Sequence, residues 1–268
     1  MGTPQMDQNH NSSIHPRGRV VLIIQARMGS TRLPGKSMMD LAGAPLVGRI
    51  LERVKRCQTL DEVVLAIPDT PADRVLATLA EQHGVTLIAG SESDLLDRYL
   101  LAARASRTAF VVRLPADNAT PEPSEIDRIV RHHLALGRPG FSSNLTVIDD
   151  SGYPDGIGAE IFDLSLLEEA QDRDPDARQR EHVHLNFFDY GQARPVDAAW
   201  CPISTLRCPA EFRRPDLVLD VNTMEQYLYM RALYEHLYPR NPNFSIVDTI
   251  RWHDEVWTPT RIATGKGR

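Results

Sequence analysis

A short loop near the start of the chain carries three basic residues that could bind a polyphosphate. The loop runs from Gln25 to Ser37 and places Arg27, Arg32 and Lys36 among glycine, serine and threonine residues. Backbone N–H groups in a loop of this composition can hold an anion, and three nearby cations can neutralise a polyphosphate. The apolar run 20–26 directly precedes it, so we expect a buried strand to hold the loop in place.

Two other interpretations of this loop stay open. A P-loop needs four residues between its first glycine and its Gly-Lys pair, whereas five residues separate Gly29 from Gly35. Pro34 also removes one N–H donor from the loop. The second alternative is a solvated basic turn, although three cations directly after a core strand are unusual for a turn.

The residues around the loop alternate between strand-like and helix-like patterns. Short apolar runs predict strands at residues 20–26, 63–67, 85–89 and 109–114. Apolar spacing and a first-turn proline predict helices at residues 46–54, 71–82, 94–104 and 123–136. This order indicates an α/β fold with a mostly parallel sheet and helices on both faces. Ligands of such sheets bind beyond the carboxyl ends of the strands, so the loops at those ends are the informative ones.

The second half of the chain is less regular. Residues 146–158 form a loop before an apolar run, and residues 173–180 are a charged stretch. We predict helices at 165–171, 182–190 and 224–237, and a strand at 217–221. No linker separates two independent units. We therefore expect a disordered tail at 1–18, one domain at 19–258 and a flexible tail at 259–268.

Composition excludes several classes of protein. The 268 residues are 42% hydrophobic and 25% charged, and the net charge of −6 argues against a nucleic-acid partner. No apolar run approaches the roughly 20 residues of a membrane-spanning helix. The three cysteines show no C-x-x-C spacing, and no apolar signal core is present, so we expect a cytoplasmic protein.

The basic loop also resembles a known signature. Residues 23–36 read IIQARMGSTRLPGK, which is similar to the signature loop of the CMP-sugar synthetase-like cytidylyltransferases. The similarity is greatest to the branch named after spore-coat polysaccharide biosynthesis proteins. It continues in order through GSESDLLDRY at 90–99, YPDG at 153–156 and REHV at 180–183. The resemblance implies a Rossmann-like nucleotidyltransferase fold, CTP as the donor and an acceptor that leaves carrying CMP.

Roles for individual residues are carried over from this resemblance. It implies that the nucleotide is bound by Ala26, Arg27, Gly29, Ser30, Arg32 and Lys36. It makes Asp117 the principal Mg²⁺ ligand and, with Arg27 and Lys36, a member of the catalytic set. It implies that the residues near the acceptor are Arg98, Asp155, Glu160, Arg180 and His182.

The chain departs from the family pattern where metal and acceptor should meet. The second metal-binding aspartate of the family corresponds to Asn222, and Asp220 lies two residues upstream. Positions two apart on a strand face the same side, so Asp220 could supply the missing charge and Asn222 an amide oxygen. The alternative is that Asp220 points away or caps the following helix. Gly158 stands where the family often carries an aspartate.

The function predicted from these residues is transfer of CMP from CTP to an anionic acceptor, with release of pyrophosphate and with Mg²⁺ as cofactor. The acceptor is a sugar acid of the Kdo or sialic type or, nearly equally, a small phosphonate. The pathway would then be polysaccharide or phosphonate biosynthesis. A nucleotide-sugar glycosyltransferase and a non-catalytic nucleotide-binding protein are the alternatives. No membrane partner is expected, and a homodimer remains open because family members are commonly dimers.

Overall fold

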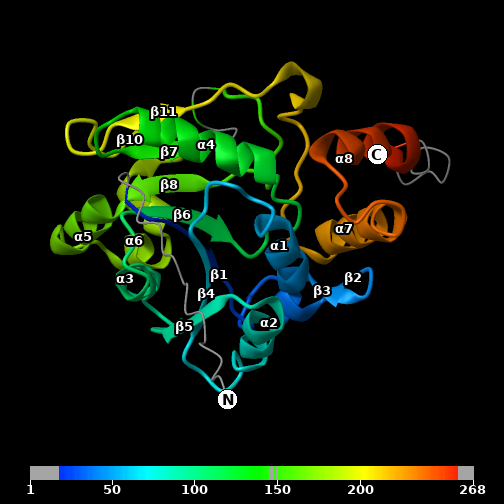
Figure 1. Ribbon diagram of the computed structural model, residues 1–268, viewed down its shortest axis with the longest axis horizontal. Helices are drawn as coiled ribbons and strands as arrows, with labels where there is room; N and C mark the ends of the chain where they lie inside the picture. Colours follow the sequence, from blue (N-terminus) through cyan, green and yellow to red (C-terminus); the bar gives the residue numbers. More distant parts are fainter. Residues whose placement is uncertain (1–17, 145–147, 149, 259–268) are drawn as a thin grey trace, which may run out of the picture.

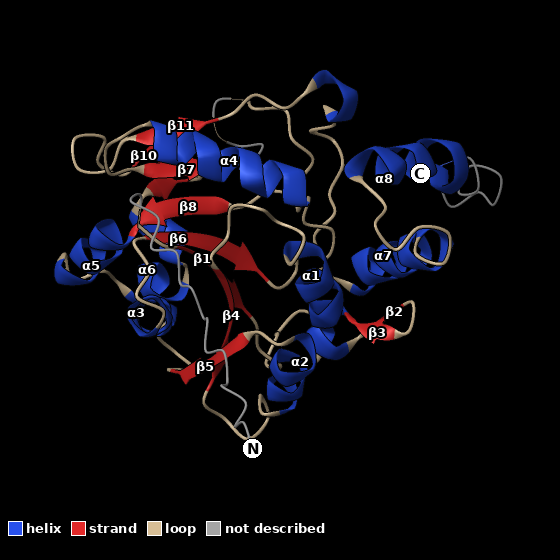
Figure 2. Ribbon diagram, in the orientation of Figure 1, coloured by secondary structure: helices blue, strands red, loops and turns tan. Residues whose placement is uncertain are grey.

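A seven-stranded sheet forms the centre of the molecule (Figure 2). The computed structural model describes residues 18–144, 148 and 150–258. The strand order is β11-β7-β8-β6-β1-β4-β5. The bounds are β1 Val20–Gln25, β4 Glu62–Pro68, β5 Thr86–Gly90, β6 Phe110–Pro115, β7 Phe141–Ser143, β8 Glu160–Asp163 and β11 Ile203–Thr205.

Most neighbouring strands run parallel, as the sequence predicts. β1 pairs in parallel with both β4 and β6, β4 pairs in parallel with β5, and β11 pairs in parallel with β7. The exception is β8, which is antiparallel to both β6 and β7. The predicted α/β fold with a mostly parallel sheet is therefore confirmed, and the four strands of the first half lie within one residue of their predicted ends.

Helices cover both faces of the sheet (Figure 1). Alternate residues of β1 point to opposite sides, because side chains alternate along a strand. Val20, Leu22 and Ile24 pack with α1 Leu46–Val54, α2 Val75–His83, α4 Pro123–Ala135 and α7 Met224–Leu237. Val21 and Ile23 pack with α3 Leu95–Ala105 and α5 Leu164–Asp172. The fully apolar sequence of β1 reflects burial on both faces.

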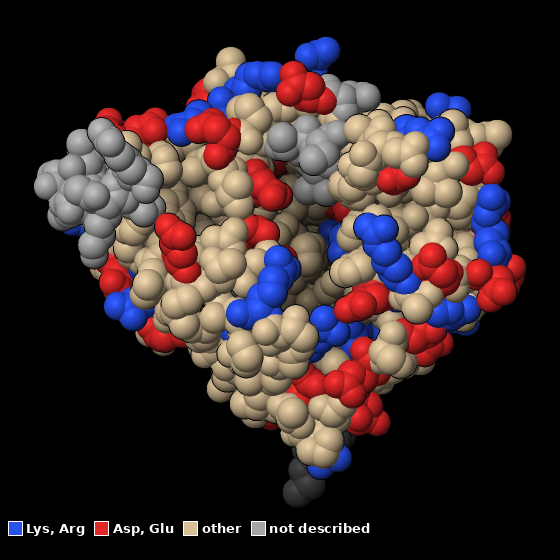
Figure 3. Space-filling view, turned by 180° about the vertical axis from the view of Figure 1, so that it is seen from behind, with Lys and Arg blue, Asp and Glu red and all other residues tan. Residues whose placement is uncertain are grey.

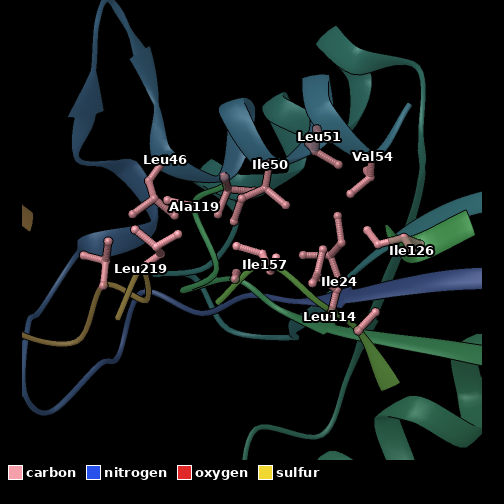
Figure 4. Packing of buried hydrophobic residues seen from close by; sticks show 14 of the residues in the cluster. Ile24, Leu46, Ile50, Leu51, Val54, Leu114, Ala119, Ile126, Ile157 and Leu219 are labelled. Carbon is pink, nitrogen blue, oxygen red and sulfur yellow. The ribbon is translucent and has the colours of Figure 1, made fainter. Parts of the chain in front are cut away.

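The face that carries α1 is packed by aliphatic side chains. In Figure 4, Leu46 and Ile50 of α1 lie on the side of the sheet to which Ile24 of β1 and Leu114 of β6 point. All four side chains have no exposed surface. This packing fixes where β1 and β6 end, and therefore where the loops that follow them begin.

Short elements complete the described chain. Their bounds are η1 Lys36–Met38, β2 Asp40–Leu41, β3 Ala44–Pro45, α6 Ala177–Glu181, η2 Val183–Asn186, β9 Phe188–Asp189, β10 Arg194–Pro195, η3 Ala210–Phe212, α8 Ile246–Trp252 and η4 His253–Trp257. Within the described residues, no helix is both long and apolar enough to cross a bilayer. The expected tails fall almost entirely at 1–17 and 259–268, outside the described residues.

Two predicted helices are wrong or displaced. The helix expected from Pro71 begins at Val75, since residues 71–74 form turns. The expected helix 182–190 is instead the 3-10 turn η2 followed by the short strand β9. The charged stretch 173–180 contains the start of α6, whose N-terminus is held by a capping box between Asp176 and Gln179.

The predicted strand 217–221 is not part of any sheet. The segment is extended, but it makes only isolated bridges, between Val218 and Asp155 and between Asp220 and Asn118. Its side chains still alternate, with Leu217, Leu219 and Val221 buried in the core. The alternation argument for Asp220 and Asn222 therefore holds without a sheet.

Candidate nucleotide-binding and acceptor site

A cleft lies at the carboxyl ends of β1 and β6. Its volume is about 470 Å³, and its lining includes residues that directly follow both strands. The lining carries acidic and basic side chains in close proximity, among them Arg27, Lys36, Asp117 and Asp220. The face shown in Figure 3 is hollowed near its centre, and side chains of both charges border the hollow. The cleft stands where open α/β sheets bind their ligands.

The loop after β1 is closed by its own hydrogen bonds. The Gly35 N–H donates to the Met28 carbonyl at 3.1 Å, and the Ser37 hydroxyl donates to the Arg27 carbonyl at 2.9 Å. Gly35 has φ 73°, a left-handed conformation that favours glycine. The loop is also tied to the rest of the chain, because the Met28 N–H donates to Asp73 at 2.6 Å. The backbone that carries the basic side chains is therefore fixed.

Lys36 and Arg32 converge on one side chain from the far end of the chain. The Nζ of Lys36 donates to Oδ1 of Asn222 at 2.9 Å and to the Val221 carbonyl at 2.8 Å. It also pairs with Oδ2 of Asp117 at 3.2 Å. Arg32 donates to the same Asn222 oxygen at 2.8 Å. The cations and the carboxylate that the sequence predicts at one site are brought together.

Arg27 differs from Lys36 in its exposure. Its side chain is 43% exposed and lies 3.4 Å from a carboxylate oxygen of Glu181, an ion pair in solvent. Such pairs hold a side chain only weakly. Arg27 is therefore free to turn toward an anion in the cleft.

Three carboxylates face the cleft because two loops pack against the extended segment before α7. The Val221 N–H donates to the Asp117 carbonyl at 2.9 Å, and the Leu219 N–H donates to the Asp155 carbonyl at 3.0 Å. A side chain at Gly156 would lie 2.8 Å from the backbone nitrogen of Asp220, so only glycine allows this approach. These contacts place Asp117, Asp155 and Asp220 around one region.

The proximity of these carboxylates alters the titration of Asp155 and Asp220. Burial raises the pKa of Asp220, and the charges of Asp155 and Asp117 raise it further. Burial also raises the pKa of Asp155, with Asp117 adding to the effect. Like charges held near one another favour a bound cation. Yet no three His, Cys, Asp or Glu side chains of the described residues are arranged as a complete metal cage.

The donor set nevertheless fits Mg²⁺. This ion is commonly held by one or two carboxylates, with water and phosphate oxygens completing its shell. Asp117 and Asp220 offer hard oxygen donors on the cleft wall. Asn222 is placed differently, because its Oδ1 accepts from two cations while its Nδ2 donates to Asp220 at 2.5 Å. The structure therefore favours Asp117 and Asp220 over Asn222 as ligands.

Asp220 also contacts the helix that follows it. Its Oδ1 accepts from the Gln226 side chain at 3.0 Å, and Gln226 forms the capping box of α7 with Thr223. The alternative interpretation of Asp220 as a helix cap is wrong, because Thr223 is the N-cap residue of α7. Asp220 does not point away either, because it lines the cleft.

The residues assigned to the acceptor lie at different depths. His182 is exposed at the cleft, whereas Arg98 is 3% exposed and donates to the Ser91 carbonyl at 3.0 Å. Glu160 is also 3% exposed, and both of its oxygens are bound, one by Arg113 at 2.6 Å and one by Tyr190 at 2.8 Å. Both oxygens of Glu160 are therefore engaged by neighbouring side chains.

Two predicted residues do not line the cleft. Gly29 is in the basic loop but outside the lining, and Arg180 pairs with Asp94 at 2.8 Å, at the N-terminus of α3. Arg180 thereby fixes the segment that carries His182. The departure at Gly158 has a steric reason, because a side chain there would lie 2.2 Å from Oδ1 of Asn144.

Sequence reasoning missed several residues of the lining, namely Gln25, Thr31, Ser37, Glu92, Ser93, Arg113, His184 and Tyr190. Arg113 had a usable signal, because a charged residue inside an apolar strand must have a partner when the strand is buried. Tyr190 had none, since it lies at the end of the segment 182–190 that was interpreted as helical.

Comparison with known protein sequences finds similarity to cytidylyltransferases. The sequence profile of the family described as "Cytidylyltransferase" matches residues 21–231. The spore coat polysaccharide biosynthesis protein SpsF of Bacillus subtilis is 31% identical over 221 residues, which cover 81% of this chain and 86% of that protein. A 3-deoxy-manno-octulosonate cytidylyltransferase of an Anaeromyxobacter species is 37% identical over 113 residues, 41% of this chain and 46% of that protein.

Solved structures agree with the sequence matches. A cytidylyltransferase from Leptospira borgpetersenii superposes with a TM-score of 0.77 at 29% identity, covering 88% of this chain and 94% of that one. A CMP:2-keto-3-deoxy-manno-octonic acid synthetase complexed with CTP superposes with a TM-score of 0.57. It is 17% identical and covers 81% of this chain and 98% of that one, so it supports the fold alone.

Proposed function

The chain belongs to the cytidylyltransferase family, and from this premise we propose that it transfers CMP from CTP to a small anionic acceptor. An acceptor oxygen forms a bond to the α-phosphorus of CTP, and the bond between this phosphorus and the bridging oxygen breaks. Pyrophosphate leaves. The observation that carries the proposal is the convergence of Lys36, Asp117 and Asp220 in one cleft beyond the ends of β1 and β6.

The basic loop supplies positioning and charge. Lys36 is held by three oxygens and is therefore oriented before a nucleotide binds. A preorganised cation costs little reorganisation when charge develops on the departing pyrophosphate. Arg27 and Arg32 are more exposed and would complete the contacts to the triphosphate, alongside the loop residues Ala26, Gly29 and Ser30.

Asp117 and Asp220 would hold Mg²⁺ in the same cleft. When bound, the ion supplies neutralisation of phosphate charge, as in other phosphoryl and nucleotidyl transfers. Asn222 has a different part in this proposal. It keeps Lys36 and Arg32 together through Oδ1 and restrains Asp220 through Nδ2.

The acceptor is a sugar acid of the Kdo or sialic type or a small phosphonate. The names of the 3-deoxy-manno-octulosonate relatives favour the first class. The substitution at Asn222 supports the second, because a neutral side chain there leaves room for an acceptor that brings its own charge. A cytoplasmic setting is part of the proposal, since Cys57, Cys201 and Cys208 are all free thiols.

Pyrophosphate release tests the proposal. The purified protein is incubated with Mg²⁺, one of CTP, UTP, ATP or GTP, and a panel of sugar acids and hydroxyalkyl phosphonates. We expect release with CTP and little release with the other nucleotides. Equal turnover with UTP would contradict the cytidylyl assignment. Binding of CTP without pyrophosphate release under any acceptor would favour a non-catalytic nucleotide-binding protein instead.

A further inference from the structure

A buried arginine lies at the inner end of the cleft. Arg113 belongs to β6 and precedes Asp117 by four residues, and its side chain is 7% exposed. Its register partner on the antiparallel strand β8 is Glu160, and the two side chains meet at 2.6 Å. Tyr190 donates to the other Glu160 oxygen at 2.8 Å. Arg113 is therefore held by Glu160, which Tyr190 in turn orients.

Hydrogen-bonding capacity remains at this end of the cleft. Nη1 of Arg113 is bound by Glu160, but its buried Nε has no partner among the described residues. The buried Nδ1 of His184 has none either, although the ring packs edge-on against Tyr190 at 4.9 Å. Folded proteins rarely leave buried polar atoms unpaired, so these two atoms of cleft-lining residues offer hydrogen-bonding capacity to a polar ligand or to ordered water.

The inner end carries almost no net charge. Arg113 and Glu160 cancel, and burial together with Arg113 lowers the pKa of His184 to about 3, which keeps this ring neutral. Burial also raises the pKa of Tyr190 well above its usual value, so the phenol stays protonated. A second buried arginine, Arg98, lies among Arg27, Asp73 and Glu92, on the side of the basic loop.

This balance limits the charge of the ligand. One negative charge can share the Arg113 guanidinium with Glu160, because a guanidinium offers five N–H donors. A second negative charge would be removed from water without a cation to pair with it, which is costly. Hydroxyl groups carry no such cost and can bond to the remaining polar atoms.

We propose that Arg113 is a specificity-determining residue for the acceptor. It admits a hydroxylated acceptor with a single negative charge and disfavours a doubly charged phosphonate. Glu160 and Tyr190 are positioning residues that orient it. The assignment rests on the proposed function. Arg113 would distinguish the two acceptor classes by their charge. Arg113, Glu160 and Tyr190 all lie outside the basic loop.

Binding measurements separate this assignment from the transfer reaction. Calorimetry of the wild-type protein with 3-deoxy-manno-octulosonate and with 2-hydroxyethylphosphonate should give at least about tenfold tighter binding of the first. Equal affinity for the two, or no binding of the sugar acid, overturns the assignment. Sugar acid binding without pyrophosphate release would instead defeat the proposed function and leave this assignment intact.

Two variants test whether Arg113 is responsible for the affinity for the sugar acid. Arg113→Lys keeps the charge but loses the planar set of donors, and should weaken sugar acid binding by at least about tenfold while the affinity for CTP changes less than about twofold. Arg53→Lys is the matched control, because Arg53 is also a buried, ion-paired arginine but lies outside the cleft. Its affinity for both ligands should equal that of the wild type.

A milder variant covers the case in which Arg113→Lys does not fold. Tyr190→Phe removes one hydrogen bond to Glu160 and should weaken sugar acid binding several-fold, with unchanged affinity for CTP. Equal weakening of both ligands would show a general structural role and would overturn the assignment of Tyr190 and Arg113 to the acceptor.

Discussion

Nζ of Lys36 donates to Oδ1 of Asn222 at 2.9 Å across 186 residues of sequence. Arg32 donates to the same oxygen, and the amide nitrogen of Asn222 donates to Asp220. This pattern fixes the orientation of the amide, because the oxygen must face the cations and the nitrogen must face the carboxylate. An asparagine at this position therefore joins the basic loop to the acidic side of the cleft.

Replacing Asn222 by aspartate tests this role. Asn222→Asp keeps an acceptor for Lys36 and Arg32 but places a second carboxylate against Asp220. We expect a lower Tm than the wild type in chelator, and a larger rise in Tm on addition of Mg²⁺, because a bound ion stabilises the folded state. Thermal unfolding with and without Mg²⁺ measures both effects.

The matched control for this variant is Asn241→Asp, which adds the same charge at an exposed site distant in sequence from the cleft residues. Its response to Mg²⁺ should equal that of the wild type. An Asn222→Asp protein that responds to Mg²⁺ no more than this control would contradict the placement of the metal beside Asp220.

The two acidic residues should differ in their effect on turnover. Asp117→Asn should lower kcat by about 100-fold or more, since the carboxylate that would hold Mg²⁺ beside the phosphates is lost. Asp220→Asn should mainly raise the Mg²⁺ concentration needed for half-maximal activity. Steady-state kinetics over a Mg²⁺ series checks both. An unchanged Mg²⁺ requirement in Asp220→Asn would leave Asp117 as the single carboxylate ligand.

The two cations of the loop should differ in their effect on stability. Lys36 is 12% exposed and bound by three oxygens, so Lys36→Ala should cost about 1–3 kcal/mol of unfolding free energy. Arg27 is 43% exposed, and Arg27→Ala should change the unfolding free energy by no more than about 0.5 kcal/mol. Both variants should raise the KM for CTP. Urea denaturation gives the first comparison, and wild-type kinetics in both variants would refute the phosphate-binding loop.

His184 should make the protein sensitive to acid. Its pKa is lowered from 6.5 to about 3 by burial and by Arg113. A group with a depressed pKa in the folded state contributes stability above its unfolded pKa, and this contribution is lost as the pH falls toward the folded value. His184→Gln should therefore lose less unfolding free energy than the wild type between pH 6.5 and about 3. Equal losses in chemical denaturation would mean that His184 is protonated without penalty.

Local patterns were sufficient to predict the basic loop that lines the cleft. The basic loop is continuous in sequence, and the apolar run before it specifies the strand that holds it. Arg27, Arg32 and Lys36 were therefore found from residue type and spacing. Asp117 could not be singled out by residue type and spacing alone. Its predicted role as a metal ligand came from the family resemblance, whereas its position just after β6 is a local feature of the sequence.

Tertiary structure decided the acceptor half. Arg113 meets Glu160 only because β8 is inserted antiparallel beside β6, a pairing across 47 residues that no local period encodes. Gly158 is set by the packing of Asn144 rather than by chemistry at the cleft. Contacts of this kind depend on which strands become neighbours and on the space left between loops. Sequence spacing determines neither, so the chain alone indicated a nucleotide loop, and the fold determined what that loop faces.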